Sequence, residues 1–439
     1  MIETTRGCPF TCTFCVDGHD SSNKISRYDP ERVKEELYLI AKKVKNVDKI
    51  EITDLNFGMY NRDIEISKAI ARVKEKFNYP YYIQVCTGKN NKARVLECVD
   101  ILKGSMGLSA SVQSLDKDVL LKVKRNNISE DQLLEMTEAG SKISGNTYSE
   151  VILALPGDSK EKHMKTVLKL ADAGMDSICM YQCMILVGSE LGSNDSVQKW
   201  KMDTKFRVLP GQYGAYDFDG KEILCAEIEE ICITTESLTL DDYYECRSFA
   251  LTEALFYQDR ILMGLYRFLK NFEIKPSELL TILHNNRHKF SEKLTSLYSS
   301  FDYDTKTELW DSKEKLKKFS DINYVNCKGE ELPFDEKSYD IVTSTYVFHE
   351  VPSAIRKKIF SEISRVLRKG GIFILTDSLQ MDDNPILNPL LEFFPYSTHE
   401  PYYPKYIRED LANVARQSGL ELFYSKNAYL SKSLAFKKI

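Results

Sequence analysis

The chain has 439 residues, and at about 150 residues per domain this length predicts two or three domains. Hydrophobic residues make up 43% of the sequence and charged residues 28%, which is typical of a globular protein and excludes a largely disordered chain. A net charge of -5 gives no general attraction to nucleic acid or to an anionic membrane. Because no apolar run approaches the roughly 18 residues needed to cross a bilayer, and no apolar signal core opens the sequence, we expect a cytoplasmic protein without a membrane anchor.

The first part of the chain, residues 1–198, alternates short β-branched runs with amphipathic segments of about 12 to 15 residues. This alternation is typical of repeated βα units around a parallel sheet. Helices are expected at Asp29–Val44, Ile64–Phe77 and Glu161–Ala173, among others. Six predicted strands fit a curved open barrel, and they lie at Ile2–Thr5, Lys49–Asp54, Tyr81–Cys86, Met106–Val112, Tyr148–Leu155 and Ser177–Leu186.

The middle of the chain, residues 199–319, loses this alternation and is interpreted as an accessory and helical extension. Its acidic EIEEI run is expected to form a solvated face, because clustered carboxylates repel one another. A long helical region is predicted from Tyr243 to about Phe319.

Residues 320–439 are predicted to form a second α/β unit. The strand YDIVTS precedes a helix at Ile355–Leu367, a turn at KGG and the strand GIFILTD. A helix at Arg408–Gln417 and two closing strands complete the expected order.

The clearest chemical signal is the sequence RGCPFTCTFC, which places Cys8, Cys12 and Cys15 in a CxxxCxxC spacing directly after the first predicted strand. The chain has 11 cysteines, an odd number, so a disulfide framework is unlikely to explain this group. Three thiolates in one short loop suit a 4Fe-4S cluster bound through three irons, which leaves the fourth iron open to a small molecule. The alternative is a structural zinc site, for which His19 is the nearest candidate for a fourth ligand.

This cysteine loop, with Phe14 at the aromatic position before the last cysteine, resembles the radical S-adenosylmethionine (radical SAM) superfamily. The resemblance implies a partial (β/α)6 TIM-like barrel in which the open iron chelates S-adenosylmethionine. One electron then cleaves S-adenosylmethionine to methionine and a 5′-deoxyadenosyl radical, which abstracts hydrogen from a substrate. It further implies a low-potential electron donor such as ferredoxin or flavodoxin.

The resemblance also implies cofactor-binding residues at the carboxyl ends of the barrel strands. In DLNFG, the residues Asn56, Phe57 and Gly58 end the second strand where the superfamily holds the methionine amino group. On the fourth and fifth strands, Gln113 and Glu150 stand where family members contact ribose and carboxylate. The alternative role of Gln113 and Glu150 is capping of a helix or turn. No catalytic residue and no substrate can be assigned from the sequence.

Within the superfamily, ETTRGCPFTCTFC, DLNFG, SVQSLD, KRNN and EVILALPGD resemble the subgroup that carries a cobalamin-binding domain in front of the barrel. That domain is absent from this sequence. Cobalamin is therefore a candidate cofactor, and we expect its domain to have been lost, to be supplied by another polypeptide, or to be cut off by a late start of the reading frame.

Residues 323–439 resemble the second half of a class I SAM-dependent methyltransferase, through GEELPF, SYDIVTSTYVFHEV and RVLRKGGIFILTD. The resemblance implies a partial doubly wound Rossmann-like unit with Thr345, His349 and Glu350 on the rim of its active site. His349 has an alternative role as a packing residue at a helix entry. No GxGxG-type loop precedes this region, so we expect the first two strands to be missing and an edge of the sheet to be exposed.

The leading hypothesis is a radical SAM iron–sulfur enzyme that modifies an unknown substrate, with methylation as one outcome. The first alternative is a class I methyltransferase that acts by direct displacement. The second is a non-catalytic fusion remnant that acts only as a binding chain. The three hypotheses differ in the iron, the reductant and the products that they require.

Overall fold

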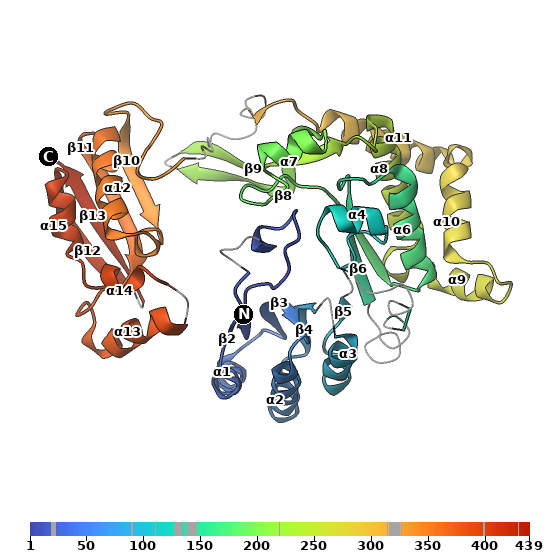
Figure 1. The fold of residues 1–439 in the computed structure, drawn as a ribbon, viewed down its shortest axis with the longest axis horizontal. Helices are drawn as coiled ribbons and strands as arrows, with labels where there is room; N and C mark the ends of the chain where they lie inside the picture. Colours follow the sequence, from blue (N-terminus) through green and yellow to red (C-terminus); the bar gives the residue numbers. More distant parts are fainter. Residues whose placement is uncertain are drawn as a thin grey trace. The chain divides into compact units, whose positions relative to one another are not determined.

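The computed structural model describes residues 1–18, 23–88, 91–109, 111–126, 134–135, 137, 147–218, 220–313, 315, 325, 327–397, 400–428 and 430–439. The chain divides into two compact units, Met1–Asn323 and Tyr324–Ile439, which we call unit 1 and unit 2. Both units mix helices with strands (Figure 1). Among the described residues, no helix has the length and apolar character needed to cross a membrane.

Unit 1 begins with a series of parallel strands in the order of the sequence. Its pairs are β3 (Lys49–Phe57) with β4 (Tyr82–Thr87), and β6 (Thr147–Leu153) with both β5 (Leu108–Ser109) and β7 (Ser177–Gln182). Parallel bridges from Ile2 to Ile52 and from Ile83 to Met106 connect the remaining neighbours. The short strands β1 (Thr5–Arg6) and β2 (Ser26–Arg27) pair antiparallel beside this series. Five of the six predicted strands therefore lie where the alternation of the sequence indicates, although the fourth and sixth are shorter than expected. The first, Ile2–Thr5, is instead an isolated parallel bridge at Ile2 followed by the antiparallel β1.

The helices of this region follow the strands, and Figure 1 shows α1, α2 and α3 side by side next to them. Their bounds are α1 (Pro30–Lys43), α2 (Asn61–Phe77), α3 (Lys92–Ile101), α4 (Lys117–Lys122), α6 (Lys160–Asp172) and α7 (Asn194–Lys199), with a 3-10 turn η1 at Val16–Gly18.

Local sequence explains why α1 forms where it does. The Asp29 carboxylate accepts the Glu31 N–H at 2.8 Å, and Pro30 occupies the first helical position, where no N–H is needed. Val33, Leu37 and Ala41 are buried at a spacing of four residues, which places them on one face. This face packs into a core that also contains Phe57 and Ile66.

The accessory segment after the sixth strand contains two strands that the sequence analysis did not predict. Residues there form a long antiparallel hairpin of β8 (Asp203–Phe218) and β9 (Lys221–Thr234). An isolated antiparallel bridge links β9 to the segment after β7, where Ile185 donates its N–H to the Glu230 carbonyl and Cys232 donates to the Cys183 carbonyl.

The expectation of a solvated acidic face is wrong for one member of the EIEEI run. Glu227 is exposed, but Glu229 is buried and forms an ion pair of 2.6 Å with Arg207. The reason is strand geometry together with charge compensation. Alternate residues of β9 point to opposite faces, and the inward carboxylate is neutralised by an arginine on β8.

After the hairpin, unit 1 becomes helical as expected, with α8 (Leu240–Phe256), α9 (Met263–Lys270), α10 (Pro276–Asn285) and α11 (Glu292–Thr307). Short 3-10 turns lie at η2 (Gln258–Arg260) and η3 (Arg287–Lys289). Thr252 on α8 links to α10 and α11 through hydrogen bonds of 2.9 Å to the His284 Nδ1 and 2.8 Å to the Tyr298 hydroxyl. The last part of the predicted helical region, residues 316–319, lies outside the described residues.

Unit 2 contains one four-stranded sheet in the order β10-β11-β13-β12. The pair β10 (Tyr339–Thr345) and β11 (Leu367–Ser378) is parallel, whereas β12 (Leu420–Ala428) and β13 (Ser431–Lys438) pair antiparallel. Its helices are α12 (Ser353–Val366), α13 (Asn388–Ser397), α14 (Tyr403–Tyr406) and α15 (Leu411–Gln417), with 3-10 turns η5 (Phe348–Glu350) and η6 (Pro385–Leu387).

Aromatic side chains form much of the core of unit 2. Phe348, Phe360, Phe373 and Phe436 are fully buried, with ring centroids of neighbouring pairs 4.9 to 6.0 Å apart. Within the described residues, β10 is paired along one edge only, and its Ile341 side chain is 58% exposed. This matches the expectation of an open sheet edge.

The predicted KGG turn is wrong, because β11 runs through these residues without interruption. Gly370 has a φ of +78°, a conformation that glycine adopts at little cost, and the register against β10 shifts between Tyr339 and Ile341. The two glycines therefore create a bulge within a strand rather than a chain reversal.

Candidate functional site

The cysteine loop follows β1 in unit 1 and is fixed by backbone hydrogen bonds from distant segments. Thr13 donates its N–H to the Val123 carbonyl at 3.1 Å, and Leu191 donates to the Thr13 carbonyl at 2.7 Å. Cys8 and Cys12 are buried, and Cys15 is half-buried. Gly18 allows the end of the loop to turn closely, since a Cβ atom there would lie 2.7 Å from the Cys12 carbonyl oxygen.

Two buried side chains donate hydrogen bonds to the thiol groups of this loop. The Asn56 Nδ2 lies 3.3 Å from the Cys8 Sγ, and the Arg125 Nη1 lies 3.9 Å from the Cys12 Sγ. Arg125 also donates to the Ser111 carbonyl. Burial lowers the pKa of the Arg125 guanidinium, while the adjacent Cys12 opposes that shift.

The donor set of the loop fits an iron–sulfur cluster. Three thiols on one short segment suit a soft metal centre, and N–H donors beside the sulfurs are the groups that stabilise and tune such clusters. No disulfide joins any of the eleven cysteines, all of which lie in the described part of the chain. His19, the candidate fourth ligand of the zinc alternative, lies outside the described residues.

The DLNFG segment at the end of β3 lies beside the cysteine loop. The Asn56 Oδ1 is buried and has no hydrogen-bond partner among the described residues. The Phe57 side chain is fully buried in the core, so only its backbone faces the site, and its carbonyl accepts the Gly88 N–H at 2.7 Å. Gly58 has a φ of +85°, and a Cβ atom there would lie 2.9 Å from a methyl group of Val95.

Asp63 fixes the turn that follows Gly58. Its Oδ2 accepts the N–H groups of Gly58 and Tyr60, each at 2.9 Å. Burial raises the pKa of the Asp63 carboxyl to about 6, although these two hydrogen bonds oppose the shift. The sequence analysis did not single out Asp63, because its role depends on a turn conformation that the residue pattern does not reveal.

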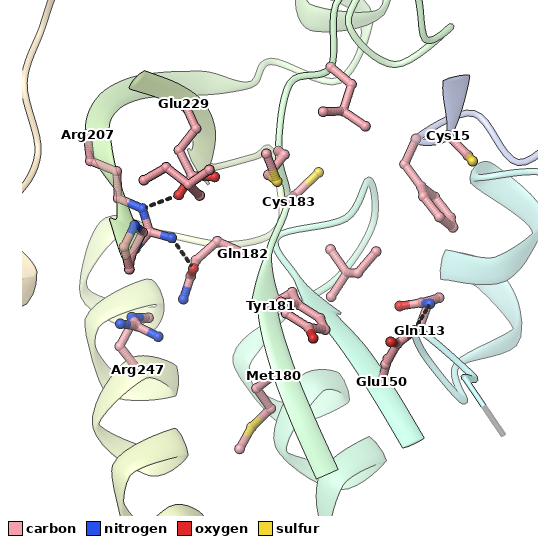
Figure 2. Close-up of a pocket in the computed structure, with 16 residues that line it drawn as sticks. Cys15, Gln113, Glu150, Met180, Tyr181, Gln182, Cys183, Arg207, Glu229 and Arg247 are labelled. Carbon is pink, nitrogen blue, oxygen red and sulfur yellow. Dashed lines mark hydrogen bonds and ion pairs between the residues drawn. The ribbon is translucent and has the colours of Figure 1, made fainter. Parts of the chain in front are cut away.

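Four of the predicted residues line one cavity of about 630 Å³ in unit 1, namely Phe14, Cys15, Gln113 and Glu150 (Figure 2). The Gln113 Nε2 donates to the Glu150 Oε2 at 3.4 Å, whereas the Gln113 Oε1 is buried without a partner among the described residues. Along β6 the odd-numbered residues from Thr147 to Leu153 are buried, and Glu150 and Ile152 lie on the opposite face, toward the cavity.

The structure brings together two groups of predicted residues around the cysteine loop. Asn56 contacts Cys8 on one side, and Gln113 and Glu150 share the cavity with Cys15. Sequence analysis missed Arg125, which belongs to the quoted KRNN motif, and the arginines of the hairpin and α8 that line the far side of the cavity. The KRNN motif was a usable signal, but the contact of Arg125 with Cys12 spans 113 residues and could not be seen in the sequence.

The rim residues predicted in unit 2 are distributed over the end of β10 and the turn that follows it. Thr345 and Glu350 are exposed, whereas His349 is buried. The His349 Nδ1 lies 2.5 Å from the Asp377 Oδ1, and the Asp377 Oδ2 accepts the Phe348 N–H at 2.8 Å. Burial lowers the pKa of His349, but the hydrogen bond and the charge of Asp377 outweigh this effect and raise the pKa above its ordinary value.

Comparison with known families matches two regions of the chain. Residues 2–171 match the radical SAM superfamily, and residues 289–375 match a methyltransferase domain. The first match contains the cysteine loop, Asn56, Gln113 and Glu150. The second contains the end of the helical extension as well as β10, α12 and most of β11.

Among curated proteins, the chain is 29% identical over 257 residues to the cobalamin-dependent radical SAM methyltransferase TokK of Streptomyces tokunonensis. This alignment covers 57% of the chain and 36% of TokK. The chain is also 35% identical over 95 residues to a sarcosine/dimethylglycine N-methyltransferase of Halorhodospira halochloris, in an alignment that covers 21% of the chain and 33% of that enzyme. Among solved structures, the radical SAM methyltransferase TsrM of Kitasatospora setae aligns with a TM-score of 0.40 and 13% identity, over 50% of this chain and 41% of TsrM.

The matched region thus spans about a third of the length of each of these two curated relatives. The radical SAM match includes the three cysteines, and the methyltransferase match includes His349. The chain carries a radical SAM superfamily domain followed by a methyltransferase domain, and its relatives include cobalamin-dependent radical SAM methyltransferases.

Proposed function

We propose that this chain is a radical SAM enzyme that methylates an organic substrate in the cavity of unit 1. The observation that carries the proposal is the cysteine loop, whose two buried thiols accept hydrogen bonds from Asn56 and Arg125 beside a cavity that reaches Cys15. The parallel series from Ile2 to β7 supports a partial (β/α)6 barrel. The strand order of unit 2 supports a partial doubly wound methyltransferase unit.

In this proposal Cys8, Cys12 and Cys15 hold a 4Fe-4S cluster. When bound, the cluster supplies the single electron that cleaves S-adenosylmethionine into methionine and a 5′-deoxyadenosyl radical. Asn56 and Arg125 hold and shield the cluster sulfurs by hydrogen bonds. Phe14, the aromatic residue of the loop, forms part of the cavity wall and excludes water from the reacting centre.

The remaining predicted residues bind S-adenosylmethionine. The backbone of Asn56, Phe57 and Gly58 forms an edge for the methionine amino group. Gln113 and Glu150 hold the ribose and carboxylate groups, and the buried Gln113 Oε1 without a described partner supports a ligand at this position.

The proposal includes two further components, an electron donor and a methyl carrier. A low-potential donor such as ferredoxin or flavodoxin supplies the electron. The relative TokK is cobalamin-dependent by name, so the proposal includes cobalamin as a methyl carrier supplied to unit 1, and the assay is run with and without it.

The test is anaerobic reconstitution of the full chain, followed by iron and sulfide analysis, electron paramagnetic resonance and product assay with dithionite. We expect about four irons per chain and release of 5′-deoxyadenosine from S-adenosylmethionine. Zinc in place of iron would overturn the proposal in favour of a structural metal loop. A chain without metal would favour the binding-only alternative.

A second candidate function is direct methyl transfer by unit 2. The observation that favours it is the His349–Asp377 pair at the ends of β10 and β11, where a polarised histidine could accept a proton from a methyl acceptor. This activity needs no electron. Formation of S-adenosylhomocysteine by a chain without iron and without dithionite would establish it, and loss of all product without reductant would exclude it.

A further inference from the structure

The cavity of unit 1 has two walls with different chemistry (Figure 2). On one wall Cys15 and Gln113 lie close to the proposed cluster and S-adenosylmethionine. On the other wall Arg207 and Arg247 point toward the space beside Gln182 and Met180. Much of the lining between the two walls is apolar and includes Ile152. A molecule that spans this cavity therefore meets charged side chains of both signs, Arg207, Arg247 and Glu229, at the end away from the cysteine loop.

Arg207 is fully engaged by groups of the protein. Its Nε lies 2.6 Å from the Glu229 Oε1, its Nη1 lies 3.1 Å from the Glu308 Oε1, and its Nη2 lies 2.6 Å from the Gln182 Oε1. Two carboxylates thus balance this single guanidinium. Arg207 completes the wall but offers no uncompensated charge to a ligand.

Arg247, on α8, is in the opposite situation. Its Nε is buried without a hydrogen-bond partner among the described residues, and its guanidinium stacks over the Phe301 ring at 5.2 Å from the ring centroid. Burial lowers the pKa of Arg247, and the nearby Glu308, already bonded to Arg207, opposes that shift only by its charge. A half-buried guanidinium whose Nε lacks a partner among the described residues is costly to the fold unless a ligand compensates its charge.

We infer that Arg247 binds a carboxylate group of the substrate, so that the substrate is an organic acid whose apolar body extends from Arg247 toward Cys15. The inference rests on the proposed function, because it takes the cavity to be the substrate site. A guanidinium presents a planar pair of donors that matches a carboxylate. A single available cation beside two protein carboxylates favours a monoanion over a phosphate dianion, which would be repelled by Glu229 and Glu308.

The arrangement also assigns an orientation to the substrate. The acid is held at the α8 wall, the apolar body lies along Ile152 and Met180, and the carbon to be modified faces the Phe14 and Cys15 side. Arg247 is thereby a specificity-determining residue that does not touch the reacting carbon. Substitution of Arg247 should therefore weaken substrate binding far more than it impairs assembly of the metal site.

The experiment measures binding of matched acids and amides to the reconstituted full chain by isothermal titration calorimetry. The probes are naphthylacetic, indoleacetic and cyclohexylacetic acids, each paired with its primary amide. We expect at least one acid to bind about tenfold or more tightly than its amide, since a charge-assisted bidentate contact distinguishes the two. The variant Arg247→Gln should abolish this preference. It should weaken binding of the acid and leave the dissociation constant of the amide within about twofold of its value for the natural chain.

Arg267→Gln, at an exposed arginine of α9, is the matched control and should keep the preference of the natural chain. Arg247→Lys keeps the positive charge but lacks the planar pair of guanidinium donors, so it should retain part of the preference for the acid over the amide. Circular dichroism and cluster absorption show whether each variant is folded. The inference is overturned if no acid binds better than its amide, or if Arg247→Gln keeps the preference.

Failure of this inference is distinguishable from failure of the proposed function. A chain that holds iron and releases 5′-deoxyadenosine but shows no preference for acids contradicts only the assignment of Arg247. A chain that prefers acids through Arg247 but holds no iron contradicts the radical reaction and leaves an acid-binding cavity.

Discussion

The two units both bury polar side chains, but they satisfy these groups differently. In unit 1 the Asn56 Oδ1, the Gln113 Oε1 and the Arg247 Nε are buried without hydrogen-bond partners among the described residues. In unit 2 the Asp377 carboxylate is shared between His349 and the Phe348 N–H, which accounts for both of its oxygens. The Arg356 Nη2 of unit 2 also lacks a partner among the described residues, but its guanidinium is already bonded to Glu409 and to two backbone carbonyls.

This difference indicates which unit is built around ligands. Buried polar groups in folded proteins are almost always paired, so several orphaned groups around one loop and one cavity suggest partners that arrive from outside. A polar pair that the protein completes by itself stabilises the fold whether or not a ligand binds. We therefore place the radical chemistry in unit 1, and four predictions test this contrast between the units.

The largest expected effect comes from Cys12→Ala in unit 1. A cluster held by two thiolates should be labile, so iron content, cluster absorption and 5′-deoxyadenosine release should fall together, with the last reduced about 100-fold or more. Iron analysis and product assay measure these changes after anaerobic reconstitution. Cys327→Ser, at an exposed cysteine outside the loop, is the matched control and should behave like the natural chain. If Cys12→Ala still cleaved S-adenosylmethionine, this result would contradict the assignment of the cluster to the cysteine loop.

The next effect concerns the fold of unit 2. Arg356 is fully buried, pairs with the Glu409 Oε2 at 2.5 Å and donates to the carbonyls of Phe348 and Val351. Arg356→Ala leaves these acceptors without a donor, so we expect a loss of about 3–5 kcal/mol in the free energy of unfolding of unit 2. Hydrogen exchange in α12 and β11 reports this loss.

Because unit 1 is a separate compact unit, its iron content should not change in Arg356→Ala. The exposed ion pair of Arg368 with Asp340 provides the control, and Arg368→Ala should cost less than about 1 kcal/mol. Loss of iron in Arg356→Ala would show that the two units do not act independently.

A smaller effect is expected from Asp377→Asn, which tests the self-contained pair of unit 2. Because the folded pKa of His349 is raised, its charged contact stabilises the fold fully below the unfolded value of about 6.5 and is lost as the pH rises through the folded pKa. At pH values below about 6.5, the free energy of unfolding of unit 2 should fall by about 1–3 kcal/mol in the variant, and it should fall by less at high pH.

Hydrogen exchange of the peptides around Phe348 at several pH values measures this effect, and the His349 ring protons report its pKa by NMR. Asp340→Asn, at an exposed carboxylate of β10, is the control. An unchanged pKa of His349 in Asp377→Asn would show that the pair carries no charge coupling.

Much of this fold follows from periodicity in the sequence, and the exceptions have physical causes. The βα alternation of unit 1 located the parallel strands, because β-branched runs and amphipathic segments differ in period. The β8–β9 hairpin was missed because Pro210, Gly211 and Gly214 interrupt the pattern of strand residues, and because Glu229 breaks the rule that buried positions are apolar. Its burial depends on Arg207, a partner 22 residues away that a local pattern cannot reveal.

The candidate site was predictable to the extent that its residues lie in short motifs. The three cysteines share ten residues of sequence, and the resemblance to a known family brought Asn56, Gln113 and Glu150 to the same place. Arg125 and Arg247 reach the loop and the cavity only through the tertiary fold. Residues proposed to hold a cofactor could therefore be named from the sequence, whereas the wall proposed to select a substrate could not.

The smallest effect concerns Asp63, a buried carboxylate that accepts the N–H groups of Gly58 and Tyr60 in the turn proposed to bind S-adenosylmethionine. The raised pKa of about 6 means that ionisation opposes folding, so stability falls as the pH rises from the ordinary value near 4 through about 6. Asp63→Asn keeps an oxygen for the Gly58 and Tyr60 N–H groups and removes the buried charge. Its free energy of unfolding should stay within about 1 kcal/mol of the natural chain, with less dependence on pH between 4 and 7.

Asp63→Ala gives the contrast, because it leaves both N–H groups without an acceptor and should cost about 2 kcal/mol. Urea unfolding followed by fluorescence of Trp200 and Trp310, both in unit 1, measures the two variants across this pH range. If Asp63→Asn and Asp63→Ala destabilise the chain equally, the two hydrogen bonds do not hold the turn, and packing of the backbone at Gly58 near Val95 must fix it instead.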